Sequence, residues 1–367
     1  MGPQHLERTI SPNPYPAKSP RMDLRTFIAG MPKAELHVHL EGTLEPSLVR
    51  AIAARNNLPV PPSLSERSSG YDFHDLTSFL AVYYPNMAVL QTATDFHDVA
   101  YHYLVKAASQ NVIHAEMFFD PQAHTGRGVP FPVVLRGYRQ AIERAQREMG
   151  LSSSLIMCFL RDLSAEFAMA TLMEALPFKD QIIGVGLDSD ERGNPPRKFK
   201  DVFARARREG FLVTMHCDID QEGSAENIRQ ALEEVQVDRI DHGTNIVEDE
   251  RLVELVKARG IGLTCCPVSN SVVTEDFKGR EISGLLRRGI KVTVSSDDPA
   301  YFRAYMNENM EKMTGEGAEL TRDELVQLQR NAFEISWVSS WRRNFFLEKL
   351  QKYADQHAAP TVLANGV

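Results

Sequence analysis

Two histidines separated by one residue stand in an apolar run near the start of the chain, and both could bind a metal ion. His37 and His39 flank Val38 within the run Ala34–Leu40. Because side chains alternate along a strand, both imidazoles would point to the same face of a sheet. An isolated His-x-His is more often an accident of composition, so this spacing is informative only together with other residues of matching chemistry.

Later apolar runs end in further groups that could bind metal or move protons. His216 follows one run, His242 stands in an Asp-His-Gly sequence, and Asp297 and Asp298 follow another run as an adjacent pair. Imidazole nitrogens together with one carboxylate form a donor set suited to Zn²⁺. We therefore predict one zinc ion held by His37, His39, His216 and Asp297.

A zinc ion in this setting would point to hydrolysis. Bound Zn²⁺ lowers the pKa of its water to about 7, which provides a nucleophile at neutral pH. His242 is the candidate that orients or deprotonates this water, although an Asp-His-Gly sequence is more often a turn. Neighbouring carboxylates point in different directions, so Asp297 could bind metal while Asp298 faces a ligand. The alternative for this pair is a helix-capping turn before Pro299.

Residues that lie far apart in the chain must be brought together by a parallel sheet. Short β-rich runs alternate with amphipathic helical stretches, a pattern typical of a sheet covered by helices. Eight such runs predict an α/β fold, a (β/α)8 TIM-like barrel whose catalytic groups lie at the carboxyl ends of the strands. The predicted strands are 34–40, 112–119, 154–160, 182–187, 211–217, 239–242, 262–266 and 291–295.

The first connection is much longer than a simple barrel crossover. Residues 43–110 contain helical patterns around Pro46–Arg55 and Leu76–Tyr84, which predicts an inserted helical cap over the barrel mouth. No linker or repeat divides the middle of the chain. We expect a flexible N-terminal arm over residues 1–22, one barrel domain over 23–355, and a flexible tail over 356–367.

Composition argues against several functional classes. The formal net charge is −8, which disfavours a protein that binds nucleic-acid phosphates. No apolar run approaches the 18 residues of a membrane span, so no membrane partner is expected. The four cysteines lie in apolar, strand-like runs and are interpreted as reduced core thiols. These features predict a cytoplasmic protein, with the nucleus as an alternative compartment.

From about residue 31 to residue 310 the chain resembles the adenosine and adenine deaminase family of the amidohydrolase superfamily. The resemblance depends on five motifs that occur in the same order: Pro32–Gly42, Val185–Glu191, Asp238–Gly243, Cys266–Asn270 and Val292–Pro299.

The resemblance implies roles for individual residues. It implies the same four zinc ligands, a His242 that assists the hydroxide, and an Asp298 that hydrogen-bonds the purine N7. Ser189 falls where the family has a glycine whose backbone meets the purine N3, so its hydroxymethyl group would narrow the pocket.

Glu41 distinguishes the base-acting branch from the nucleoside-acting branch in this resemblance. Nucleoside-acting members typically carry an aspartate here that reaches the ribose, and Glu41 is one methylene longer. A longer carboxylate could occupy the space of the sugar, so we expect Glu41 to line the substrate site. The predicted reaction is conversion of the small-molecule purine adenine to hypoxanthine and ammonia, with adenosine as an alternative substrate.

One departure from the family pattern concerns the proton donor. Family members carry His-Ala-Gly-Glu, whereas this chain has Ile219 at the glutamate position, and a hydrocarbon cannot exchange a proton. About two extra residues follow His216. Asp220 is the first choice for a relocated acid, Glu222 the second and Asp218 the third. The alternative for the proton donor is that all three are solvated loop carboxylates. The same reshaped loop could admit N6-substituted adenines as substrates. The alternative to an enzyme is a purine-binding pseudoenzyme.

Overall fold

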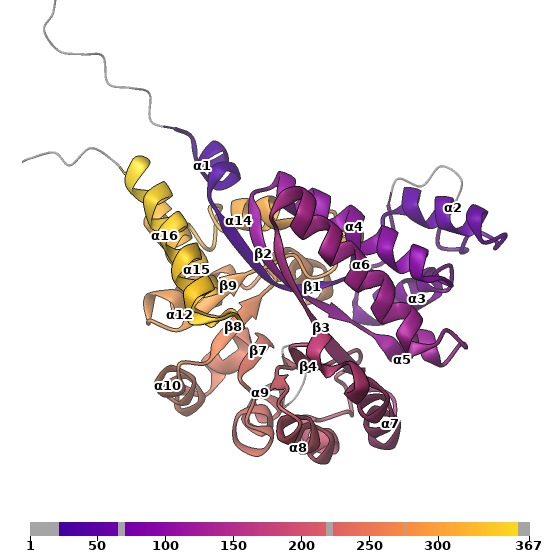
Figure 1. The fold of residues 1–367 in the computed structure, drawn as a ribbon. Coiled ribbons are helices and arrows are strands. Elements are labelled where there is room, and N and C mark those ends of the chain that lie inside the picture. The colour runs from indigo at the N-terminus through magenta and orange to yellow at the C-terminus, as the bar shows by residue number, and fades with distance from the viewer. Residues whose placement is uncertain (1–21, 65–69, 218–222, 275, 359–367) are drawn as a thin grey trace, which may run out of the picture.

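A computed structural model describes residues 22–64, 70–217, 223–274 and 276–358 of the chain. All neighbouring strands in it are parallel and form two sheets, in the orders β1-β2-β3-β4-β5 and β6-β7-β8-β9. Figure 1 shows the strands at the centre of the molecule with helices outside them. The strands are β1 (Lys33–His39), β2 (Val112–Phe119), β3 (Ser152–Leu160), β4 (Gly184–Asp188), β5 (Leu212–Val213), β6 (His216–Cys217), β7 (Arg239–His242), β8 (Gly262–Cys265) and β9 (Lys291–Val294).

The two sheets are joined at both of their edges. The predicted fifth run is divided into β5 and β6, and between them the amide of Thr214 donates to Val185 while Met215 accepts from Asp241. At the other side, Val38 of β1 forms a parallel bridge with Asp297, just after β9. The predicted eight-stranded α/β barrel is therefore confirmed, with one predicted strand interrupted in its middle.

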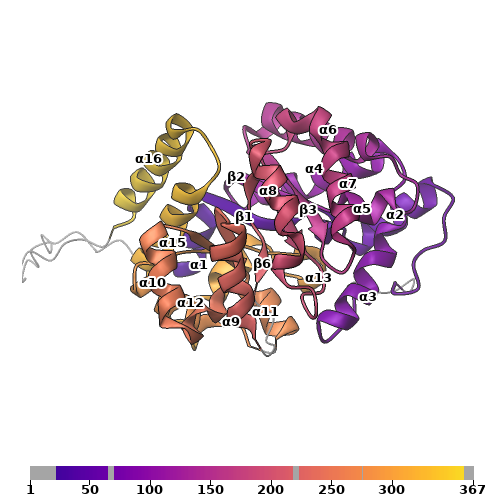
Figure 2. The ribbon, with the colours of Figure 1, turned by 90° about the horizontal axis from the view of Figure 1, so that it is seen from below.

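Helices follow the strands and cover the outside of the barrel, as the view from below in Figure 2 shows. The α-helices are α1 (Leu24–Gly30), α2 (Pro46–Arg55), α3 (Leu76–Met87), α4 (Ala93–Ser109), α5 (Pro121–Thr125), α6 (Phe131–Met149), α7 (Ala165–Ala175), α8 (Lys200–Arg208), α9 (Ser224–Arg229), α10 (Glu250–Arg259), α11 (Pro267–Val273), α12 (Gly279–Arg287), α13 (Pro299–Phe302), α14 (Met306–Lys312), α15 (Arg322–Ile335) and α16 (Ser340–Gln356).

The long connection after β1 has two different roles. Its helix α3 begins with a capping box between Asp75 and Ser78 and contributes side chains to a cavity at the barrel mouth. Its last helix, α4, instead packs along α6 on the outside of the barrel. A Cβ added to Gly137 of α6 would lie 2.4 Å from the carbonyl oxygen of Ala93, so the close approach of the two helices requires glycine there. Only part of the predicted cap therefore covers the mouth.

One hydrophobic core runs from Phe27 to Leu350, and Cys158, Cys217, Cys265 and Cys266 are buried free thiols, as predicted. Among the helices that the structure describes, none combines the length and apolar character needed to cross a membrane. Most of the predicted N-terminal arm, residues 1–21, and residues 359–367 of the predicted tail lie outside the described residues.

Candidate active site

Four side chains predicted as metal ligands meet at the carboxyl ends of the strands. One donor atom from each of His37, His39, His216 and Asp297 lies within 4.8 Å of every other. The Nε2 atom of His37 is 3.1 Å from Oδ1 of Asp297, and the Nε2 atoms of His39 and His216 are 3.0 Å apart. The residues come from β1, β6 and the turn after β9, so the barrel fold brings them together.

The other ring nitrogens of His39 and His216 also face acceptors, and the hydrogen bond of His216 fixes its proton on Nδ1. Nδ1 of His216 donates to the carbonyl oxygen of Leu187 at 3.1 Å, and Nδ1 of His39 faces Oδ2 of Asp188 at 3.6 Å. A neutral imidazole with its proton on Nδ1 carries a lone pair on Nε2. The Nε2 atoms of His39 and His216, 3.0 Å apart, require a proton or a metal ion between them. This arrangement fits a divalent metal ion.

Asp297 reaches the histidines because its backbone continues the barrel. Its carbonyl oxygen accepts from the amide of His39 at 2.9 Å, and its amide donates to His37 at 3.0 Å. Its φ of 65° lies in the left-handed region, which is unfavourable for a residue other than glycine. Ser189 and His242 share this conformation, with φ of 72° and 59°. Such strain clusters at functional sites, where the surrounding fold imposes it.

Asp298 points away from the metal ligands and into the cavity. Its Oδ1 is buried and has no hydrogen-bond partner among the described side chains. Burial raises the pKa of Asp298 well above its usual value, and the neighbouring Asp297 raises it further. A Cβ on Gly42 would lie 1.9 Å from this oxygen, so glycine is needed beside it. Asp298 therefore offers a hydrogen-bonding group to a ligand in the cavity.

His242 lies beside His37 of β1, with their ring centroids 4.6 Å apart, and also faces Asp297. Its Nε2 is 3.8 Å from Oδ2 of Asp297. Burial lowers the pKa of His242 to about 3, and the neighbouring His37 lowers it as well. The ring is therefore neutral at physiological pH and can accept a hydrogen bond at the edge of the metal site.

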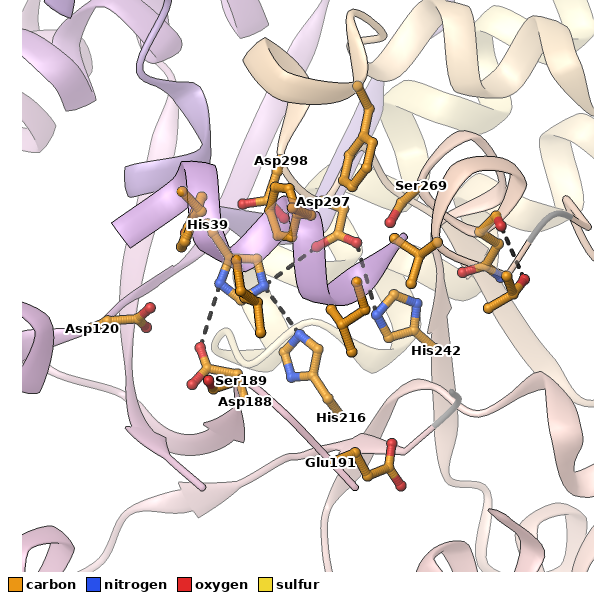
Figure 3. Close-up of a pocket in the computed structure, with 18 of the residues that line it drawn as sticks. His39, Asp120, Asp188, Ser189, Glu191, His216, His242, Ser269, Asp297 and Asp298 are labelled. Atoms are coloured by element: carbon orange, nitrogen blue, oxygen red, sulfur yellow. Dashed lines mark hydrogen bonds and ion pairs between the residues drawn. The ribbon is translucent and has the colours of Figure 1, made fainter. Parts of the chain in front are cut away.

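The cavity in front of these residues has one polar wall and one aromatic wall. It measures about 710 Å³ including the part open to solvent. Helix α3 supplies most of the aromatic wall, and Figure 3 shows the polar residues around His39. Ser189 lines the cavity as predicted from the sequence, and its Oγ accepts from the hydroxyl of Tyr84 at 2.8 Å. The apolar and aromatic lining residues are Leu76, Phe79, Leu80, Tyr83, Tyr84, Val273 and Phe302.

Three carboxylates that were not predicted as site residues from the sequence also line the cavity. Asp120 follows β2, Asp188 ends β4, and Glu191 follows β4 and accepts from Asn227 at 2.7 Å. Burial raises the pKa of Asp120 well above its usual value, as does the neighbouring Asp188. Burial also raises the pKa of Asp188 to about 7. The available signal was their place after predicted strands, the same rule that selected Asp297.

Glu41 differs from the expectation that it lines the substrate site. It is fully buried and is not part of the cavity wall. Its Oε1 instead accepts from His124 at 2.9 Å and from Tyr138 at 2.8 Å. Burial opposes its ionisation, but these two hydrogen bonds lower the pKa of Glu41 overall. These bonds hold the carboxylate toward α5 and α6, so it does not occupy the space in front of the metal ligands.

The proposed proton donors cannot be placed. Asp220, with its alternatives Glu222 and Asp218, falls in the segment 218–222, which lies outside the described residues. The segment directly follows Cys217 of β6 and therefore begins one residue after a predicted metal ligand.

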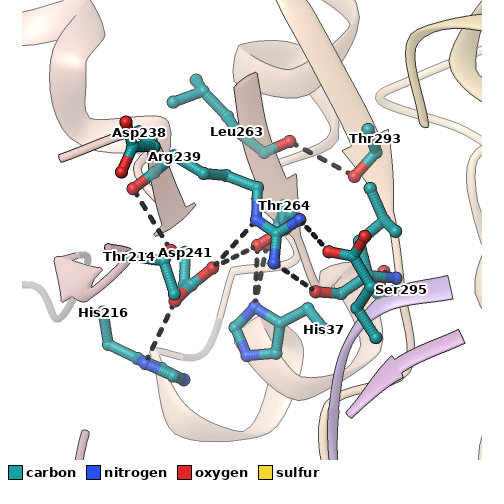
Figure 4. Close-up of polar contacts among 12 residues, drawn as sticks. His37, Thr214, His216, Asp238, Arg239, Asp241, Leu263, Thr264, Thr293 and Ser295 are labelled. Carbon is teal, nitrogen blue, oxygen red and sulfur yellow. Dashed lines mark hydrogen bonds and ion pairs between the residues drawn. The ribbon is translucent and has the colours of Figure 1, made fainter. Parts of the chain in front are cut away.

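A buried polar network inside the barrel contacts the Nδ1 sides of His37 and His216, as Figure 4 shows. Nδ1 of His37 donates to Oγ1 of Thr264 at 3.0 Å, and that hydroxyl donates to Oδ1 of Asp241 at 2.9 Å. Asp241 also lies 3.7 Å from Nδ1 of His216. Arg239, fully buried, is 3.9 Å from Asp241 and pairs with Glu116 at 2.6 Å. Partners of this kind orient metal-binding imidazoles.

Comparisons with known proteins agree with this architecture. The family model described as adenosine deaminase matches residues 32–353. An adenine deaminase from Geotalea uraniireducens is 47% identical over 91% of this chain and 94% of its own length.

Two solved structures are also similar along most of the chain. An adenine deaminase from Arthrobacter aurescens superposes with a TM-score of 0.83 at 38% identity, covering 89% of this chain and all of that one (100%). An amidohydrolase from Burkholderia ambifaria, solved with bound zinc, superposes with a TM-score of 0.81 at 25% identity, covering 93% and 97% of the two chains. The match of the family model over most of the sequence, together with these relatives, shows that the chain belongs to the adenosine deaminase family.

Proposed function

We propose that the protein hydrolyses adenine to hypoxanthine and ammonia. The observation that carries this proposal is the convergence of three imidazoles and Asp297 at the base of a cavity walled by aromatic side chains. An aromatic wall suits a flat heterocycle, and the polar groups Asp298 and His242 lie beside the metal ligands. The adenine deaminases among the relatives supply the substrate class.

We assign the metal as one zinc ion, held by His37, His39, His216 and Asp297. Three nitrogen donors and one carboxylate oxygen suit Zn²⁺. The bound ion supplies activation of water at neutral pH. His37 and His216 are held by hydrogen bonds at Nδ1, and Nδ1 of His39 faces Asp188 at 3.6 Å, so their Nε2 atoms are directed toward the metal position.

The protein's own groups then bind the ring and move protons. His242, neutral because burial lowers its pKa to about 3, accepts a hydrogen bond from the attacking water. Asp298, whose pKa is raised by burial, forms a hydrogen bond with N7 of the ring. Asp220 delivers a proton to N1 as the water oxygen bonds to C6, and one proton of the water then restores the acid. The C6–N6 bond breaks as the C6=O bond forms, and ammonia leaves with the other proton of the water.

A spectroscopic screen of aminopurines tests the proposal. The ultraviolet spectrum of a purine changes on deamination, so adenine, adenosine, N6-methyladenine and N6-isopentenyladenine can be compared with the same zinc-loaded preparation. We expect adenine to give the highest kcat/KM. Turnover of a substituted base at a higher rate would reassign the substrate, and no turnover of any aminopurine would overturn the proposed function.

A further inference from the structure

Two buried carboxyl groups line the cavity beside the metal ligands. Asp120 and Asp188 are 2% and 4% exposed, and both belong to the cavity wall. The two carboxyl groups interact with one another, and Asp188 also interacts with the Cys158 thiol, but the Oδ1 atom of each carboxyl has no hydrogen-bond partner in the described part of the chain. A buried acceptor without a partner is unfavourable. These two oxygens therefore point to a donor that enters with the ligand.

A second metal ion is one possible ligand for this pair, because His39, Asp120 and Asp188 lie close enough to hold one. However, Nε2 of His39 already faces Nε2 of His216 at 3.0 Å, and Nδ1 of His39 faces Oδ2 of Asp188 at 3.6 Å. A neutral imidazole that binds a metal through one nitrogen carries a proton on the other. His39 cannot bind two ions in this form, so a ligand with an N–H group fits the pair better.

The position of the pair relative to the metal ligands indicates which part of a purine it would meet. In Figure 3, Asp120 and Asp188 lie on the side of His39 that faces away from His242. The reacting carbon must lie between the metal ligands and His242, so the far edge of the ring faces Asp120 and Asp188. In a free purine that edge carries the imidazole-ring N–H, whereas in a nucleoside this hydrogen is replaced by a sugar carbon.

Aromatic side chains of α3 line the same cavity as Asp120. Helix α3 packs against α5, which begins one residue after Asp120. Tyr83 and Tyr84 of α3 line the same cavity, and the hydroxyl of Tyr84 is held at 2.8 Å by Ser189. A substituent on the ring nitrogen would leave the carboxylate without its donor.

We propose that Asp120, supported by Asp188, accepts the imidazole-ring N–H of an unsubstituted purine and thereby selects the free base over the nucleoside. The proposal rests on the proposed deaminase function and adds a specificity determinant to it. A site built to hydrogen-bond an N–H group discriminates strongly against an analogue that lacks it, because the buried acceptor is then left unpaired.

The first test uses the wild-type enzyme with adenine, 9-methyladenine and adenosine. We expect kcat/KM for 9-methyladenine to be at least about 10²-fold below that for adenine, because only the N–H is lost and one methyl group is added. Equal use of adenine and 9-methyladenine would overturn this inference while leaving the proposed function intact. Turnover of no aminopurine by the zinc-loaded enzyme would overturn both.

The second test removes the acceptor. In Asp120→Ser we expect kcat/KM for adenine to fall about 10- to 100-fold, mainly through KM, while the value for 9-methyladenine changes less than about threefold. Asp120→Asn keeps the size of the side chain, so it shows the same trend if the serine variant folds poorly. An equal loss for both substrates would assign Asp120 a structural role and overturn the proposal.

Two controls distinguish the loss of this hydrogen bond from a general effect of removing a carboxylate and from an effect on metal binding. Glu174 is an exposed carboxylate of α7 that does not line the cavity, so Glu174→Gln should change neither substrate by more than about twofold. Zinc content per chain should be the same in all variants. Loss of a second equivalent of zinc in Asp120→Asn would show that the carboxyl pair binds metal and would overturn the proposal.

Discussion

His216 is central to the predicted metal site. It faces His39 directly and is itself held by the backbone of β4. We expect His216→Ala to abolish stoichiometric zinc binding, since the remaining ligands leave an incomplete site. Zinc per chain, measured by elemental analysis after gel filtration, checks this result. His102→Ala, which removes an exposed histidine of α4, is the matched control and should retain the metal. Full zinc content in His216→Ala would contradict the ligand assignment.

Asp220 is the proposed replacement for the family's glutamate, and its role is separate from metal binding. We expect Asp220→Asn to retain zinc and to lower kcat at least about 10²-fold, because a carboxamide cannot deliver a proton. Steady-state kinetics on adenine, with zinc content measured in parallel, check the prediction. Near-normal turnover in Asp220→Asn together with a large loss in Glu222→Gln would transfer the role to Glu222.

The hydroxyl of Thr264 links a metal ligand to the buried network of Asp241 and Arg239. Thr264→Val keeps the shape of the side chain but removes this hydroxyl. We expect about a tenfold weaker zinc affinity, since such partners orient the imidazole. Competition with a fluorescent chelator measures this change. Thr293→Val removes a buried hydroxyl on the next strand that bonds only a backbone carbonyl, and its zinc affinity should be unchanged.

At the scale of elements, α15 positions the start of the barrel strands that carry the site. Gln329 accepts from the amide of Ala34 at the start of β1, and Asn331 donates to Val292 of β9. The helix begins with a capping box between Thr321 and Glu324, and this box satisfies amide groups that the helix leaves free. The first turn of α15 is therefore coupled to the strands on either side of the metal ligands.

Glu324 makes the stability of the N-terminal end of α15 dependent on pH. Its hydrogen bond from Arg287 lowers the pKa of Glu324 from 4.5 to about 2. Because the folded pKa lies below the unfolded value, the stabilisation is complete above about pH 4.5 and is lost as the pH falls toward 2. We expect Glu324→Gln to lower Tm by about 2 °C at pH 7, with the difference from wild type disappearing near pH 2.

Thermal unfolding followed between pH 2 and pH 7 tests this element-scale prediction. Glu348→Gln, which changes an exposed carboxylate on α16, is the control and should show no comparable pH-dependent difference. A constant Tm difference across the range would mean that Glu324 acts by packing alone.

At the scale of the whole molecule, the metal ligands connect both sheets of the barrel. His37 and His39 belong to the first sheet, His216 to the second, and Asp297 lies at the bridge that joins β1 to the end of β9. A ligand that binds only the folded state stabilises it in proportion to RT ln(1 + [L]/Kd). Metal binding should therefore stabilise the barrel as a unit.

Removal of the metal tests this coupling. We expect dialysis against a chelator to lower Tm by several degrees and re-addition of zinc to restore it. The His216→Ala variant should show the same low Tm with and without zinc. An unchanged Tm in the wild type would show that the barrel closes independently of the ion.

Local patterns in the sequence were sufficient to predict the barrel and the residues that meet at the carboxyl ends of its strands. Strand alternation and helical periodicity are short-range properties, so β2 and β7 have the predicted bounds. Two histidines on one strand face the same way for the same reason. The adjacent pair Asp297 and Asp298 point in different directions, again as neighbouring residues must.

Long-range packing decided which carboxylates face the cavity. Glu41 turns away because His124, 83 residues later in the chain, and Tyr138 bond its oxygen. Asp120 and Asp188 come together because β2 and β4 end at the same rim, a contact that no local period encodes. Hydrogen-bond partners for buried charges come from residues distant in the sequence, so only the closed fold determines which charges are satisfied internally and which remain available to a ligand.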